Sequence, residues 1–79
     1  MYKTFKIGEY CRGGILVADI NNGVVKVTAQ NWDTKETIAS VLQPTFNEWN
    51  MFLFLNDMTS SYYADKVMDY IKKALTTKN

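Results

Sequence analysis

Residues 15–30 carry the sequence ILVADINNGVVKVTAQ, which decides the fold. Two runs rich in aliphatic and β-branched residues, 15–20 and 24–30, lie on either side of Asn21-Asn22-Gly23. β-Branched side chains favour strands, and an Asn-Gly pair favours the positive φ angles of a tight hairpin turn. We therefore predict a β-hairpin at the centre of the chain.

A further strand is expected on each side of this hairpin. Residues 2–7 alternate between two sets of side chains up to Gly8, and a Gly13-Gly14 turn leads into the hairpin. After a turn at residues 31–35, residues 36–43 form another strand, which Pro44 ends because proline cannot donate to the ladder. The first half of the chain therefore predicts four antiparallel strands.

The second half carries two helix signals. Thr45 and Glu48 have the spacing of a capping box, so a helix is expected to begin there. An apolar stripe follows at helical spacing, formed by Phe46, Trp49, Phe52, Leu53 and Leu55. Thr59 or Ser60 can cap a second helix, whose longer apolar stripe is formed by Ala64, Val67, Met68, Ile71, Ala74 and Leu75. Its opposite face carries charges, with Asp69 and Lys73 at the favourable i, i+4 spacing.

These elements predict an α+β fold, a four-stranded antiparallel sheet followed by two helices (β-β-β-β-α-α). Seventy-nine residues are about half of a typical ~150-residue domain, so we expect a single domain, 1–79, with residues 76–79 as a flexible tail. The expected core comprises Ile15, Val17, Val25, Val27, Trp49, Phe52, Leu53, Val67, Met68 and Ile71.

The strand at residues 15–20 is apolar on both sides, because Leu16, Ala18 and Ile20 alternate with Ile15 and Val17. The sequence therefore does not determine which alternate set of side chains on this strand faces the core. One side of the strand can be covered by the helices and the other by a partner chain. Together with the small core of so short a chain, this favours a homodimer.

The composition argues against catalysis. The chain has no histidine, which removes the usual general base near neutral pH and the commonest ligand for zinc, copper or haem. Cys11 stands beside Arg12 in a Gly-rich turn without a histidine partner. Asp57, Asp65 and Asp69 do not follow the pattern of a calcium loop and are expected to form surface ion pairs. We therefore expect a non-enzymatic binding protein with no cofactor and no metal site.

Charge and segment patterns limit the compartment and the partners. Nine Lys and Arg against eight Asp and Glu give a net charge of +1, far from the basic balance of a dedicated duplex-DNA binder. A single cysteine cannot close an intrachain disulfide, whereas small secreted domains usually hold several cysteines. No run approaches the ~20 apolar residues that span a bilayer, and residues 1–6 lack a signal peptide's apolar run. We expect a cytoplasmic protein that makes no membrane contact.

The open side of the predicted sheet is a candidate nucleic-acid-binding surface. On the strand at residues 24–30, Lys26, Thr28 and Gln30 lie on the face opposite Val25 and Val27, because successive side chains point to opposite faces. Trp32 follows on the polar face. Lys6, Arg12 and Lys26 would contact phosphates, while Trp32 and Tyr10 would stack on bases. The alternative interpretation is that this side is simply the solvated face of an antiparallel sheet.

Three segments resemble the positive cofactor 4 family of single-stranded-DNA-binding transcriptional coactivators, with its small bacterial and phage relatives and the related Whirly and Pur-type folds. Phe5-Lys6-Ile7-Gly8 is similar to the family's opening Phe-x-Ile-Gly, residues 20–32 to its central hairpin, and Phe46-Asn47-Glu48-Trp49 to its Pro-Glu-Gln-Trp helix start. The resemblance implies a curved sheet backed by a helix, dimerisation, and a groove for single-stranded DNA. Lys6, Arg12 and Lys26 fall where the family's basic strand positions would lie. The family's further lysines and arginines in the third and fourth strands have no counterpart in residues 36–43, and the second helix is an addition.

The competing hypothesis is a protein-interaction module, an inhibitor or adaptor of the kind that phages and mobile elements encode, which masks a partner's surface. Its support is the near-neutral charge and a predicted aromatic patch at Tyr62, Tyr63 and Tyr70. A continuous positive groove on the open face of the sheet would favour single-stranded DNA over a protein partner.

Overall fold

The computed structural model describes residues 1–76 of the 79-residue chain. Its elements, in chain order, are β1 (Tyr2–Lys6), β2 (Ile15–Asn21), β3 (Val24–Gln30), β4 (Thr37–Gln43), α1 (Glu48–Met58) and α2 (Ser61–Thr76). This order confirms the predicted α+β fold. Thr76, which we expected in a flexible tail, is the last residue of α2, and residues 77–79 of that tail lie outside the described residues.

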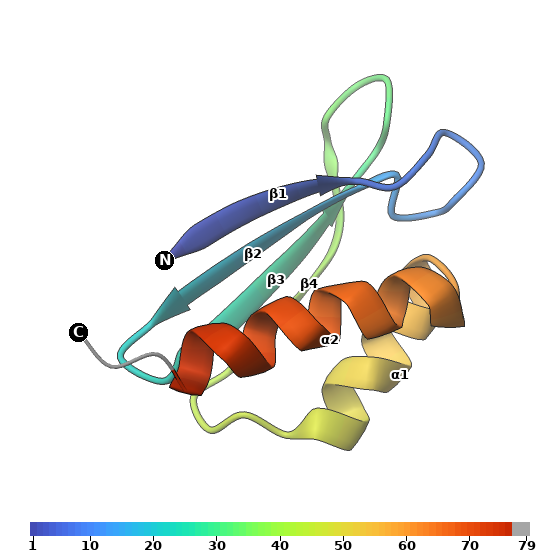
Figure 1. Ribbon diagram of the computed structural model, residues 1–79. Helices are drawn as coiled ribbons and strands as arrows, with labels where there is room; N and C mark the ends of the chain where they lie inside the picture. Colours follow the sequence, from blue (N-terminus) through green and yellow to red (C-terminus); the bar gives the residue numbers. More distant parts are fainter. Residues whose placement is uncertain (77–79) are drawn as a thin grey trace.

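The four strands form one antiparallel sheet in the order β1-β2-β3-β4. Both helices pack on the same face of this sheet, and no element of residues 1–76 covers the opposite face (Figure 1). α2 lies against β2 and against α1. The sheet therefore has an inner face toward the helices and an open face.

The turn between β2 and β3 has the predicted hairpin geometry. Asn21 pairs with Val24, which leaves Asn22 and Gly23 as the two loop residues. Their φ angles are 52° and 81°, and a type I′ turn requires positive φ at both central residues. The hairpin prediction is confirmed.

The inner face of the sheet is built by alternate residues of β2 and β3. Leu16 and Ala18 are buried and lie in register with Ala29 and Val27, which are also buried. This register answers the question that the sequence left open, because the inward-facing set of β2 is Leu16, Ala18 and Ile20. These side chains pack with the buried faces of both helices in one core cluster.

Ile15 and Val17, which we expected in the core, lie on the open side of β2. Val17 is in register with Thr28 and is only partly buried, so its assignment to the core is wrong. Ile15 is buried, but its neighbours in register are Lys6 and Gln30, and it lies outside the core cluster. Successive residues of a strand point to opposite faces, so once one set faces the helices the other faces away.

Helix α1 begins two residues later than the capping box predicts. Its N-cap is Asn47, whose side chain accepts a hydrogen bond from the Asn50 backbone N–H at 2.9 Å. The buried Gln43 side chain at the end of β4 fixes this cap, because its Oε1 accepts from the Asn47 N–H at 3.0 Å and its Nε2 donates to the Asn47 carbonyl at 3.3 Å. The prediction that Thr45 starts the helix is therefore wrong.

The buried side of α1 also differs from the expected stripe. The buried residues of the helix are Met51, Leu55 and Met58. Trp49 is 67% exposed and Leu53 is 45% exposed, so their assignment to the core is wrong, and Phe52 is only partly buried. The reason is that residues 49–56 contain no charge, so the apolar pattern of α1 does not select one face.

Helix α2 follows the predicted stripe closely. Ala64, Val67, Met68 and Ile71 are buried, and Ala74 and Leu75 pack against the core. The Ser60 carbonyl accepts the first helical hydrogen bond, from the Ala64 N–H at 2.8 Å. On the outer face, Lys73 Nζ lies 2.9 Å from the Asp69 carboxylate, as the i, i+4 spacing predicts.

The loop between β1 and β2 contacts the end of α1 at Gly13. The Gly13 N–H donates to the Met58 carbonyl at 2.7 Å. A Cβ at this position would lie 3.0 Å from Met58 Cβ and 3.2 Å from Ala29 Cβ. Only glycine therefore lets this loop lie so close to both the helix and the sheet.

Candidate interaction surfaces

The open face of the sheet is predominantly uncharged. By strand register, its side chains form three rows: Tyr2, Asp19, Lys26 and Leu42; Thr4, Val17, Thr28 and Ser40; and Lys6, Ile15 and Gln30. The Thr28 and Ser40 hydroxyls are hydrogen-bonded at 3.4 Å. The middle row therefore presents hydroxyls and one valine, and the charges lie in the two outer rows, Asp19 and Lys26 in the first and Lys6 in the third.

Two of the five predicted nucleic-acid-binding residues, Lys6 and Lys26, lie on this open face. Lys26 is directly opposite Asp19 on the neighbouring strand, so a negative charge stands beside it. Lys6 lies in the row of Gln30, four residues along β3 and two strands across from Lys26, a backbone separation of roughly 16 Å. The two lysines therefore do not form a continuous positive groove.

Arg12 is engaged on the helix side of the molecule. Its guanidinium donates to the Asp57 carboxylate of α1 at 2.9 Å, with both side chains more than 60% exposed. This ion pair joins the β1–β2 loop to α1, next to the contact made by Gly13. Arg12 therefore does not contribute its charge to the open face.

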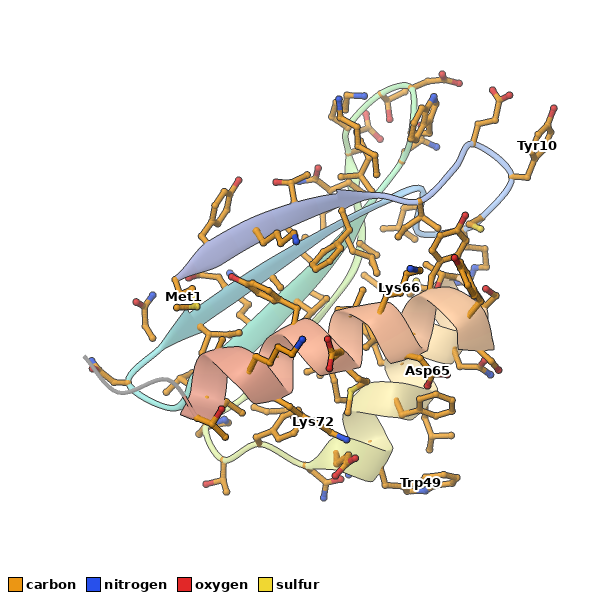
Figure 2. The ribbon with its side chains drawn as sticks, viewed as in Figure 1. Met1, Tyr10, Trp49, Asp65, Lys66 and Lys72 are labelled. Carbon is orange, nitrogen blue, oxygen red and sulfur yellow. The ribbon has the colours of Figure 1, made fainter. Side chains whose placement is uncertain are left out.

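The two predicted stacking residues lie in separate loops. Tyr10 is 96% exposed at the far end of the β1–β2 loop, where it points away from the sheet (Figure 2). Trp32 lies between β3 and β4, with Lys35 Nζ 5.7 Å from its ring centroid and its Cβ against Gly14. The fold therefore does not gather the five predicted residues into one site.

A second surface, which the sequence did not predict, is a groove between α1 and α2. Its volume is about 370 Å³, and it is lined by Glu48, Trp49, Phe52, Asp65, Met68 and Lys72. In Figure 2, Asp65 and Lys72 reach from α2 toward α1, and Trp49 projects from the first turn of α1. The Trp49 and Phe52 rings are stacked, with their centroids 6.4 Å apart and an interplanar angle of 20°.

The charges at the rim of this groove are unequal. Lys72 forms an ion pair with Glu48 across the two helices. Within residues 1–76, no hydrogen bond or ion pair engages the Asp65 carboxylate. Two carboxylates and one ammonium give the rim a net charge of −1, since −2 + 1 = −1. The groove is thus an aromatic and apolar surface with one unpaired carboxylate.

The predicted aromatic patch on α2 is divided by the fold. Tyr62 and Tyr63 meet edge to face, with centroids 5.1 Å apart, and Lys66 Nζ lies 4.9 Å from the Tyr62 ring centroid. Tyr70 instead packs edge to face against Phe5 of β1, with centroids 5.6 Å apart. Tyr70 therefore supports the sheet edge rather than a shared patch with the other two tyrosines.

No cluster of three or more Cys, Asp or Glu side chains that could hold a metal ion occurs in the described part of the chain. Cys11 is a partly buried free thiol. Neither helix of residues 1–76 has the length and apolar character needed to cross a bilayer. No protein-family model, curated protein or solved structure matched this chain.

Proposed function

We propose that this protein is a non-enzymatic protein-binding module whose contact surface is the outer side of α1 together with the α1–α2 groove. The observation that carries this proposal is that α1 is apolar on both sides, while residues 1–76 cover only one of them. Met51 and Leu55 face the core, whereas Trp49 and Leu53 are exposed on the other side.

The chemistry of this outer side is that of a protein interface. Trp49 and Leu53 are separated by one helical turn, and Phe52 lies between them in the sequence and stacks on Trp49. Tryptophan is enriched among the residues that dominate binding energy, and a rim of charges around an apolar centre is typical of interfaces. The charges of α1 lie near its two ends, at Glu48 and Asp57.

Site-specific photo-cross-linking tests this proposal. A benzophenone amino acid at position 53 should give discrete protein adducts in cells that express the gene, and Trp49→Asp in the same chain should abolish them. The control is the same photoreactive residue at position 33, exposed in the β3–β4 loop. Adducts from position 53 that persist with Trp49→Asp, or that equal those from position 33, would contradict the proposal.

Single-stranded DNA binding through the open face is the second candidate, and Lys6 and Lys26 on that uncovered face are the observation that favours it. Two phosphate contacts would give a log–log salt slope of about −1.4 for a single strand. Titration of labelled oligo(dT) at two salt concentrations measures this slope. Lys26→Glu, which leaves the core untouched, should remove binding, and a wild-type chain that binds no oligo(dT) at low salt excludes this candidate.

A further inference from the structure

We propose that the α1–α2 groove receives a lysine or arginine side chain of the protein partner, with its cation held between the Trp49–Phe52 aromatic pair and the Asp65 carboxylate. This inference rests on the proposed function and specifies the chemistry of the partner. Three features of the groove support it, namely its aromatic wall, its charge and its apolar floor.

The aromatic wall is suited to a cation and is vacant within the described chain. Lys3 lies over Phe5 and Tyr70, Lys35 over Trp32, and Lys66 over Tyr62, each with its Nζ 4.9–5.7 Å from a ring centroid. No Lys or Arg of residues 1–76 stands over Trp49 or Phe52 in the same way. Tryptophan is the best of the aromatic side chains for a cation–π contact, so its ring is the natural place for a cation from outside the chain.

The charge at the rim favours the same ligand. Asp65 has no partner in the described residues, while the one cation of the rim, Lys72, is already paired with Glu48. An incoming carboxylate would meet the unpaired Asp65 and a neutralised Lys72. An incoming ammonium or guanidinium would gain an ion pair with Asp65 without breaking the Lys72–Glu48 bridge.

The floor suits the aliphatic part of the same side chain. Met68, at 5% exposure, and the partly buried Phe52 contribute apolar surface between the two helices. Lysine and arginine place their methylene stems on apolar surface while their charged ends stay at a polar rim. A volume of about 370 Å³ is at the small end of ligand pockets, as expected for one side chain rather than a large ligand.

The experiment selects random dodecapeptides displayed on phage against the full-length protein and, in parallel, against Trp49→Ala. Trp49 is largely exposed, so this variant should fold, and circular dichroism verifies that it does. Peptides that require Trp49 should be enriched in Lys or Arg relative to the unselected library. Replacing that basic residue by norleucine in a synthetic peptide should weaken binding at least several-fold, measured by fluorescence anisotropy.

Two charge variants should act with opposite signs on the affinity for the selected basic peptide. Asp65→Asn removes the unpaired carboxylate and should weaken binding about two- to fivefold, as for a partly exposed ion pair. Lys72→Gln releases Glu48 and should tighten binding about twofold. The matched control is Asp33→Asn in the β3–β4 loop, away from both helices, which should leave the affinity unchanged (Figure 1).

The outcomes separate this inference from the proposed function. The cation site is refuted if the peptides that require Trp49 are not enriched in Lys or Arg. It is also refuted if neither Asp65→Asn nor Lys72→Gln changes their affinity. Either result leaves α1 as a protein-binding surface. If no selected peptide requires Trp49, the cation site is also overturned, and the photo-cross-linking result alone then decides the proposed function.

Discussion

Replacing Leu55 and Leu53 separately by alanine tests which side of α1 is buried. The two residues have the same side chain on the same helix, but Leu55 is 0% exposed and Leu53 is 45% exposed. The sequence pattern placed both in one buried stripe. The structure instead predicts that the two substitutions differ strongly in their effect on the free energy of unfolding.

The magnitudes follow from the burial of each side chain. Leu→Ala removes about three carbon groups, worth roughly 2.4 kcal/mol when fully buried. At Leu55 a cavity adds to this loss, so the expected cost is about 3–4 kcal/mol. At Leu53 roughly half of the side chain is already in water and no cavity forms, and alanine is the better helix former, so we expect about 1 kcal/mol.

Urea denaturation followed by circular dichroism at 222 nm measures both values. A chain of 79 residues has a total stability of about 4–12 kcal/mol, so Leu55→Ala should remove a large share of it. Thermal unfolding should show the same order, with about 4–8 °C lost per kcal/mol. Equal losses, or a larger loss for Leu53→Ala, would falsify the orientation of α1 and with it the exposed surface on which the proposed function depends.

Three further predictions concern the loop contacts and self-association. Gly13→Ala should destabilise the fold by about 1–3 kcal/mol in urea denaturation, because the new methyl group would lie 3.0 Å from Met58 Cβ, and an unchanged midpoint would refute this close contact. A double-mutant cycle on Arg12 and Asp57 should give a coupling energy below about 1 kcal/mol, since both side chains are more than 60% exposed, and a larger value would mean a more buried pair. Sedimentation velocity of the wild-type protein at tens of micromolar should show a dimer of about 18 kDa, twice 9.1 kDa, and a single 9 kDa species would contradict the dimer prediction. Leu42 is 60% exposed on the open face, so Leu42→Glu should convert the dimer to a monomer.

Local patterns were sufficient to predict the sheet. The Asn22-Gly23 pair needs only its own backbone preferences to make a hairpin, and the two-residue alternation of β3 separates Val25 and Val27 from Lys26 without reference to distant residues. The helical stripe of α2 was equally readable, because charged residues occupy its opposite face. In each case the information lies within a few residues along the chain.

The orientation of α1 could not be read in the same way. Its segment 49–56 is uncharged all round, so Trp49 and Leu53 fit a buried stripe as well as Met51 and Leu55 do. The choice depends on Gln43, which binds the Asn47 backbone and sets where the helix begins, and on packing against the sheet. Either apolar face of α1 could pack on the core, and only the tertiary structure determines that the face with Met51 and Leu55 does so.

The candidate site was likewise decided by contacts between distant segments. Arg12 was predicted to bind phosphate, but Asp57, forty-five residues further along the chain, takes its guanidinium on the helix side. Trp49 and Asp65 line one groove because α1 and α2 pack against each other. The sequence specifies the chemistry of each side chain. Which distant side chain it contacts depends on how the connections between elements bring them together in space, and local sequence spacing does not determine this.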